Sequence, residues 1–206
     1  NKSFLVERVP RSGGPILRWW RYTMALKKYA KDADVIYAFS SVSCGLPIRW
    51  ARVRKPKQVL RLGGDFLWER ATDRGSMLSL PDWYKKGGWQ MFVGKWLLQP
   101  FDHLVFSTAY QKKIYEEHYE YLPPSTVIEN ALATSVDSLE HRLHEPMRLL
   151  VFSRLVRFKN LSVLIDAVTC LKVQLSIVGD GPLKPALQSQ VDRLGLDGRV
   201  LFVGAV

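Results

Sequence analysis

Residues 147–206 constrain the fold most, because short apolar runs alternate there with segments of helical periodicity. The apolar runs have the length of buried strands. Between them, residues 161–171 and 183–194 place apolar side chains along one side of a helix. Strands that alternate with helices predict a parallel sheet with crossover helices, and therefore an α/β fold. The three expected strands are residues 147–152, 173–178 and 200–203.

The loops after the first two strands carry the candidate binding residues. Arg154 follows the first strand, and Lys159 precedes a helix for which Asn160 is the expected N-cap. Ligands of open parallel sheets bind beyond the carboxyl ends of the strands. A helix N-terminus flanked by an arginine and a lysine is suited to a diphosphate. The loop after the second strand consists of Gly179, Asp180, Gly181 and Pro182. It matches neither a Walker loop nor the dinucleotide fingerprint.

Three segments, FSRLVRFKN, IVGDGPLKPAL and RVLFVGAV, resemble the start of the carboxyl-terminal domain of GT4-type (group 1) glycosyltransferases. The resemblance implies the GT-B fold, with two Rossmann-like parallel-sheet domains. It gives Arg154 and Lys159 the role of holding the diphosphate of a UDP- or GDP-sugar, and residues 179–182 the role of a nucleotide loop. It also implies a retaining reaction that needs no metal ion or other cofactor. Ser153 stands where the family usually has glycine.

Residues 1–132 repeat the alternation of strands and helices. The order of strand, serine, helix and VIENA resembles a family segment that leads to the interdomain linker, with Asn130 matching the family's asparagine and Ala131 replacing its glycine. We expect Ser107 to start the last helix, and residues 34–39 to form a buried strand. The other expected elements are a helix at 16–33, strands at 58–62 and 101–107, a strand and turn at 125–131, a loop at 70–82, and helical segments at 83–100 and 109–119.

Two glycines and two acids follow the strand at 58–62. Gly63 and Gly64 allow a sharp turn or the close approach of a ligand, and they are assigned to the acceptor side. Asp65 and Glu69 are candidates for contacts with a sugar or acceptor, and Asp65 is the candidate catalytic residue. The alternative is that Asp65 caps the next helix. The family often has a histidine at this strand end, and this chain has none near it.

The resemblance divides the chain into three parts. Residues 1–132 correspond to a partial acceptor-binding domain, 133–146 to a linker, and 147–206 to the first part of a nucleotide-sugar-binding domain. Both Rossmann-like domains are therefore expected to be incomplete, and the family's paired glutamates would lie beyond Val206. An internal fragment of this kind leaves the activity of the chain by itself open.

The net charge of +11 is concentrated at the amino terminus, because residues 1–60 carry thirteen Lys or Arg and three Asp or Glu. Three interpretations stay open. The first is an anionic membrane surface that binds residues 16–57, where aromatic residues and cations mix as they do in interfacial helices. The second is nucleic acid, which is disfavoured because no recognised binding module is present. The third is that Trp19 and its neighbours belong to the core and that the cations are only the solvated face of the same helix.

The remaining features limit the function classes. Cys44 and Cys170 are far apart and are expected to be buried free thiols in a reducing compartment. His141 and His144 have a helical metal-binding spacing without supporting ligands, so we expect no metal site. No segment has the length of a transmembrane helix, and the amino terminus does not read as a signal peptide.

We therefore expect a cytoplasmic, peripherally membrane-bound hexosyltransferase that moves a sugar from a nucleotide-sugar to a lipid-linked or polysaccharide precursor of the cell envelope. The alternatives are a non-catalytic GT-B-like binding or scaffold domain at a membrane surface, and a GT-B epimerase or phosphorylase.

Overall fold

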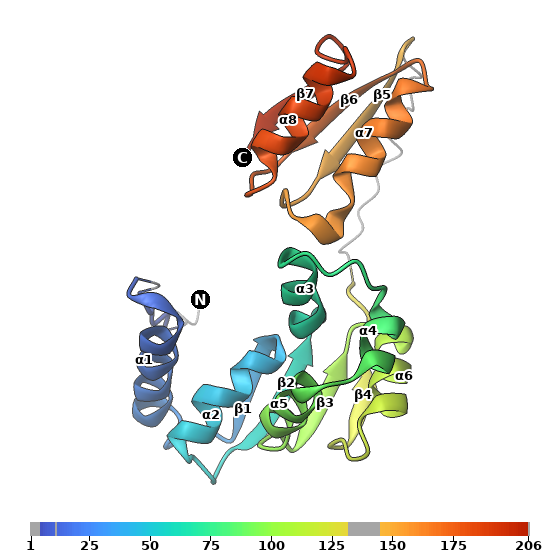
Figure 1. Ribbon diagram of the computed structural model, residues 1–206. Coiled ribbons are helices and arrows are strands. Elements are labelled where there is room, and N and C mark those ends of the chain that lie inside the picture. The colour runs from blue at the N-terminus through green and yellow to red at the C-terminus, as the bar shows by residue number, and fades with distance from the viewer. Residues whose placement is uncertain (1–4, 11, 132–144, 206) are drawn as a thin grey trace. The chain divides into compact units, whose positions relative to one another are not determined.

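The computed structural model describes residues 5–10, 12–131 and 145–205 (Figure 1). The chain divides into two compact units. The first unit takes in residues 1–71 and 77–132, and the second takes in 133–206 together with 72–76. Each unit has a parallel sheet with helices between its strands, which confirms the predicted α/β class. Most of the expected linker, including His141 and His144, lies outside the described residues.

The first unit is built on four parallel strands in the order β1-β2-β3-β4. Its core lies along β2 and β3, where Leu60, Leu62, Leu104 and Phe106 are fully buried. The strands are β1 (Val35–Ser40), β2 (Lys57–Leu62), β3 (His103–Phe106) and β4 (Ser125–Val127). The helices are α1 (Gly14–Tyr29), η1 (Val42–Cys44), α2 (Gly45–Ala51), α3 (Phe66–Asp73), α4 (Leu80–Lys86), α5 (Trp89–Leu98) and α6 (Ala109–His118).

The prediction that residues 34–39 form a buried strand is wrong for one face of β1. Val35, Tyr37 and Phe39 are each more than half exposed, whereas Ile36 and Ala38 pack against the core. β1 pairs only with β2 among the described strands, so it is an edge strand of this sheet. The segment is apolar on both faces, and its sequence therefore gives no sign of which face is covered.

The prediction of a loop at residues 70–82 is wrong at both ends, because α3 extends to Asp73 and α4 begins at Leu80. Ser79 caps α4, since its Oγ accepts a hydrogen bond from the backbone N–H of Asp82 at 3.3 Å. Gly87 and Gly88 have positive φ angles and separate α4 from α5 within the segment that was expected to be largely helical.

Ser107 does not start helix α6 as predicted. Thr108 is the N-cap, and its Oγ1 accepts a hydrogen bond from the N–H of Gln111 at 3.1 Å. The hydroxyl of Ser107 instead donates to the carbonyl of Leu62 at 2.6 Å, so it ties β3 to the end of β2. Both residue types are good N-caps, and packing across the sheet decides between them.

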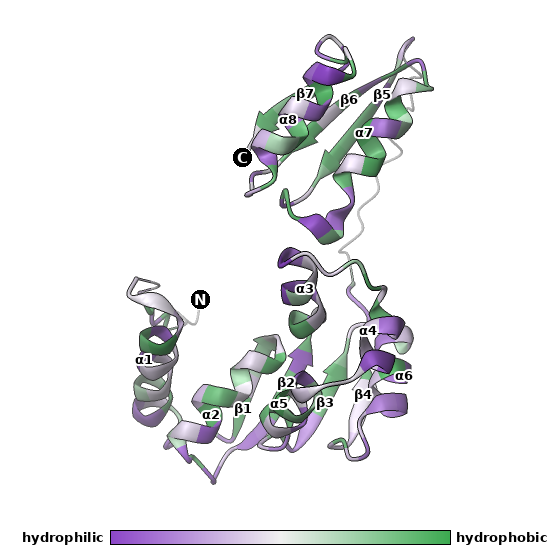
Figure 2. Cartoon of the chain, viewed as in Figure 1, coloured by the Kyte–Doolittle hydropathy of each residue, from purple (hydrophilic) through white to green (hydrophobic). Residues whose placement is uncertain are grey.

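The second unit has three strands in the order β5-β6-β7, and they form a parallel sheet, as the sequence predicted. Figure 2 shows hydrophobic residues along these strands. Ile165, Val191 and Ile177 are fully buried between α7, α8 and the sheet, whereas Leu150 and Phe152 on the opposite face are more than half exposed. The elements are β5 (Met147–Phe152), η2 (Arg157–Lys159), α7 (Leu161–Thr169), β6 (Val173–Val178), α8 (Lys184–Arg193) and β7 (Val200–Gly204).

Two further predictions concern the cysteines and membrane-spanning helices. Both cysteines are free, but Cys44 is half-buried and Cys170 is exposed, so the prediction of buried thiols is wrong for Cys170. Cys170 lies at the C-cap of α7, where the chain leaves the core before β6. Within the described residues, no helix is long and apolar enough to cross a bilayer.

Candidate functional site

The two loops with candidate binding residues lie side by side at the carboxyl end of the second sheet. The N–H of Leu155 donates to the carbonyl of Asp180 at 3.0 Å, and the N–H of Leu183 donates to the carbonyl of Leu155 at 3.1 Å. The N–H of Ser153 also donates to the carbonyl of Val178 at 3.0 Å. The structure therefore brings together the loop after β5 and the loop after β6 through main-chain hydrogen bonds.

Gly179 and Gly181 make this close packing possible. Gly179 has a φ of 138°, and a Cβ atom there would overlap the carbonyl oxygen of Ser153. A Cβ at Gly181 would lie 2.5 Å from the carbonyl oxygen of Leu155. Both obstacles are backbone atoms, which cannot rotate away. The two glycines thus set the spacing of the loops, and the carboxylate of Asp180 turns back to accept a hydrogen bond from the N–H of Gly181 at 2.8 Å.

Arg154 and Lys159 are both exposed and share one aromatic neighbour. The guanidinium carbon of Arg154 lies 5.8 Å from the centre of the Phe158 ring, and Nζ of Lys159 lies 5.3 Å from it. In the part of the chain that the structure describes, neither cation forms an ion pair. Two uncompensated positive charges therefore gather beside the paired loops.

Asn160 occupies the N-cap position of α7, as predicted, but without the side-chain hydrogen bond of a usual cap. Its backbone is left-handed, with a φ of 55°, and its carbonyl accepts from the N–H groups of Val163 and Leu164. This turn places Lys159 directly before the first turn of α7, where helix N–H groups and the positive end of the helix dipole are available to an anion.

Ser153, which stands where the GT4-type segment usually has glycine, adopts an unstrained backbone. Among the described residues, the only non-glycine positions with positive φ are Arg52 and Asn160, so the backbone at Ser153 does not require glycine. The hydroxyl of Ser153 donates to the carbonyl of Arg154 at 2.8 Å. This departure leaves the loop geometry intact.

In the first unit, the loop after β2 is held from several sides. The side-chain amide of Gln111 donates to the carbonyl of Gly64 at 3.1 Å, and the carboxylate of Glu69 lies against Gly64. Gly63 is exposed at the end of β2. Gly63, Gly64 and Glu69 thus lie together at one strand end, and their role on the acceptor side stays a prediction.

Asp65 is buried, with 5% of its surface exposed, and both of its carboxylate oxygens accept hydrogen bonds within the unit. Oδ1 accepts from the N–H of Trp68 at 2.9 Å, which confirms the alternative interpretation as a cap of α3. Oδ2 accepts from the hydroxyl of Tyr84 at 2.5 Å. Burial raises the pKa of Asp65, and the hydrogen bond from Tyr84 acts in the opposite direction. A catalytic role for Asp65 stays a prediction.

Arg61 is a residue that sequence reasoning missed. It lies on β2 with 9% of its surface exposed. Its Nη2 donates to the carbonyl of Ile128 and to Oδ1 of Asn130, each at 2.9 Å. The sequence signal was an arginine inside an expected strand, since a buried arginine requires polar partners. Arg61 therefore fixes the segment after β4 and orients Asn130, the residue that matches the family's asparagine.

Within the described ranges, no group of three or more His, Cys, Asp or Glu side chains is placed to hold a metal ion. The candidate site in the second unit instead offers cations, helix N–H groups and loop backbone. These are groups that can bind an anion, and binding of a diphosphate by Arg154 and Lys159 stays a prediction.

Solved structures with a similar fold include three proteins that are in complex with UDP or UDP-glucose. A mutant of S. aureus TarM, in complex with fondaparinux, alpha-GlcNAc-glycerol and UDP, is 13% identical over 92% of this chain and 37% of its own, with a TM-score of 0.67. Anabaena HepE with UDP-glucose is 19% identical over 92% and 52%, with a TM-score of 0.62. The pneumococcal O-GlcNAc transferase GtfA with UDP and GlcNAc is 15% identical over 88% and 36%, with a TM-score of 0.51.

These similarities show the fold. The two units correspond to partial Rossmann-like domains of the GT-B fold, which confirms the predicted fold class. The chain spans about half or less of the length of these three proteins. No family model matches the chain, and no curated protein matches it. Membership of the GT4 group therefore stays a prediction.

Proposed function

We propose that this chain is part of a glycosyltransferase that moves a sugar from a nucleotide-sugar, linked to UDP or GDP, to an acceptor bound by the first unit. The observation that carries the proposal is the pair of apposed loops beside Arg154 and Lys159 at the start of α7. The GT-B fold supports it, as do the fold neighbours solved with UDP or UDP-glucose.

The proposed mechanism is electrostatic. When the bond between the sugar and the diphosphate breaks, its electron pair stays on the diphosphate, which gains negative charge. Arg154 would hold two phosphate oxygens with its planar guanidinium, and Lys159 would add a point charge. The N–H groups of the first turn of α7 would stabilise the same leaving group. The backbone of residues 179–182 would lie along the nucleotide, because its glycines allow a close approach.

The finer parts of the proposal rest on the family resemblance. They are retention of the anomeric configuration, independence of metal ions, membership of the hexosyltransferases, and a lipid-linked or polysaccharide precursor as the acceptor at the cytoplasmic face of a membrane. On the acceptor side, exposed Gly63 is the contact point, and Gly64 and Glu69 shape the loop. Buried Asp65 positions this loop through its cap of α3.

Isothermal titration calorimetry with UDP and GDP tests the donor site without requiring turnover. Arg154→Ala/Lys159→Ala should weaken binding at least about a hundredfold, because each hydrogen bond from a charged group contributes about 1.5–3 kcal/mol. The matched control is Lys172→Ala/Arg193→Ala, which removes two exposed cations elsewhere in the second unit and should bind as the wild type does.

Equal binding by the Arg154/Lys159 variant and the wild type would contradict the assignment. If neither nucleotide binds the wild-type chain, the non-catalytic alternative is favoured instead. If the wild type binds UDP or GDP and the Arg154/Lys159 variant binds it more weakly, the same two substitutions in the full-length protein should also lower the rate of sugar transfer.

A further inference from the structure

Two adjoining hollows on the first unit are lined, among the described residues, by cations and by no acid. The smaller, of about 630 Å³, lies between α1 and the end of α2. The larger, of about 1080 Å³, runs from α2 to the segment after α5, and Lys27 lines both. We call this area the cationic surface, and its charged residues are Lys27, Lys28, Lys31, Arg49, Arg52 and Arg54.

These charges are not neutralised by ion pairs within the described residues. Arg49 is held by neutral groups, because Nη2 donates to the carbonyl of Trp96 at 2.7 Å and to Oε1 of Gln99 at 3.0 Å. Its guanidinium lies 4.4 Å from the centre of the Trp96 ring. Lys28 lies over the ring of Tyr29, whose hydroxyl donates to Glu7. The six cations therefore have no ion-pair partner within the described residues.

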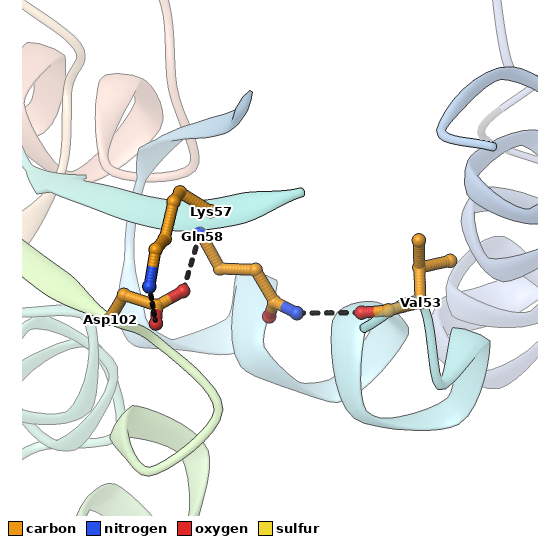
Figure 3. A network of polar contacts seen from close by, with 4 residues as sticks. All are labelled: Val53, Lys57, Gln58 and Asp102. Atoms are coloured by element: carbon orange, nitrogen blue, oxygen red, sulfur yellow. Dashed lines mark hydrogen bonds and ion pairs between the residues drawn. The ribbon is translucent and has the colours of Figure 1, made fainter. Parts of the chain in front are cut away.

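The loop that contains Arg52 and Arg54 is held at Val53 by the side chain of Gln58 (Figure 3). The side-chain amide of Gln58 donates to the carbonyl of Val53 at 2.8 Å. The backbone N–H of Gln58 donates to Asp102 at 2.8 Å, and the same carboxylate pairs with Lys57 at 3.3 Å. These contacts anchor the loop and leave the two arginines exposed.

Arg52 adopts a left-handed backbone, with a φ of 53°, at the C-cap of α2. This conformation costs a residue with a Cβ atom free energy that glycine would avoid. Cations near the carboxyl ends of α1 and α2 also stabilise the helix dipoles, which accounts for part of the clustering. That effect does not account for Arg54, which lies beyond the end of α2.

Large apolar side chains are exposed beside the cations. Trp50, which lines the larger hollow, is 40% exposed, and Met24, which lines the smaller one, is 38% exposed. On α1, Trp20 is 52% exposed. A soluble phosphate needs no apolar contact, whereas a bilayer surface offers acyl chains beneath its charged headgroups. Cations mixed with aromatic and aliphatic side chains are therefore suited to a membrane interface.

We propose that the cationic surface docks the first unit on an anionic membrane, with phosphate headgroups in the two hollows and Trp20 and Trp50 at the level of the acyl chains. The purpose of this docking rests on the proposed function, since it would bring a lipid-linked acceptor to the first unit. The binding itself is independent of the donor site in the second unit.

Vesicle flotation tests the proposal, with vesicles of phosphatidylcholine and phosphatidylglycerol at about three to one compared with phosphatidylcholine alone. The wild-type chain should bind the anionic vesicles and not the neutral ones. A cation near an anionic surface contributes about fivefold to the binding constant. Lys27→Glu/Arg52→Glu/Arg54→Glu should therefore lower binding at least about a hundredfold.

The matched control is Lys85→Glu/Lys86→Glu/Lys172→Glu, which reverses three exposed cations outside the cationic surface. Both triple variants lower the net charge from +11 to +5, so a non-specific charge effect would weaken both alike. We expect the control to keep most of its vesicle binding. Trp20→Ala should weaken binding to anionic vesicles while leaving the net charge unchanged.

Equal loss in the two triple variants would overturn the proposal, as would equal binding to neutral vesicles. Binding of a single-stranded RNA that depends on Lys27, Arg52 and Arg54, without vesicle binding, would also overturn it and favour nucleic acid. UDP binding, measured on the same variants, should be unchanged. Failure of the membrane proposal is therefore distinguishable from failure of the proposed donor site.

Discussion

Gly181→Ala tests the packing on which the candidate donor site depends. The new Cβ would lie 2.5 Å from the carbonyl oxygen of Leu155 and 2.7 Å from its amide nitrogen. Because both are backbone atoms, the loops after β5 and β6 would have to separate. Separation weakens the hydrogen bonds that Leu155 makes with Asp180 and Leu183, at 3.0 and 3.1 Å.

The magnitude follows from two contributions. Overpacking of a close contact costs about 1–3 kcal/mol, and each weakened hydrogen bond costs up to about 1 kcal/mol. We expect the free energy of unfolding of the second unit to fall by about 2–4 kcal/mol. A unit of this size rarely has more than about 3–5 kcal/mol in total, so the loss is most of its stability.

Urea denaturation with two probes separates the units. All seven tryptophans lie within residues 1–132, and residues 133–206 contain neither Trp nor Tyr. Tryptophan fluorescence therefore follows the first unit, whereas far-ultraviolet circular dichroism follows both. With an m-value of about 1 kcal/mol/M, Gly181→Ala should lower the dichroism midpoint of the second unit by about 2 M or more and leave the fluorescence midpoint unchanged.

Two other glycines of the second unit supply matched controls. A Cβ at Gly198 would meet no atom within 4 Å, and its φ is not positive, so Gly198→Ala should leave stability unchanged or slightly raised. Gly195 has equal space but a φ of 65°, so Gly195→Ala measures backbone strain alone. If Gly181→Ala shifts the midpoint no more than Gly198→Ala does, the argument from loop packing is wrong.

Two further predictions concern the first unit. Arg61→Met removes the hydrogen bonds to Ile128 and Asn130, and it should lower the free energy of unfolding seen by tryptophan fluorescence by about 1.5–3 kcal/mol; Asn130→Ala, which removes one of the two, should cost less, and the reverse order would refute the assignment. Burial raises the pKa of Asp65 above its ordinary 3.8, so the contribution of Asp65 to stability is full below pH 3.8 and is lost as the pH rises through the folded-state pKa. Asp65→Asn removes this titration, so its stability relative to the wild type should rise over the same pH range in denaturation measurements, and a pH-independent difference would count against a raised pKa.

Local sequence was sufficient for the elements of the second unit. Its apolar runs and helical periods predicted β5, β6, β7, α7 and α8, because each pattern arises within one element. The loop residues could be located for the same reason, since they follow the strands directly. The same reasoning failed for β1, where an apolar segment carries no sign that one of its faces stays uncovered.

The candidate site illustrates the same division. The sequence by itself determined that Arg154, Lys159 and residues 179–182 follow neighbouring strands of a parallel sheet, because residue type and spacing are local properties. Only the tertiary structure decided that Gly179 and Gly181 lie so close to the backbone of Ser153 and Leu155 that no side chain fits there. It likewise decided that Asp65 bonds Tyr84, 19 residues away, and that Arg61 bonds Asn130, 69 residues away. Such pairs depend on how distant segments pack, which no local pattern contains.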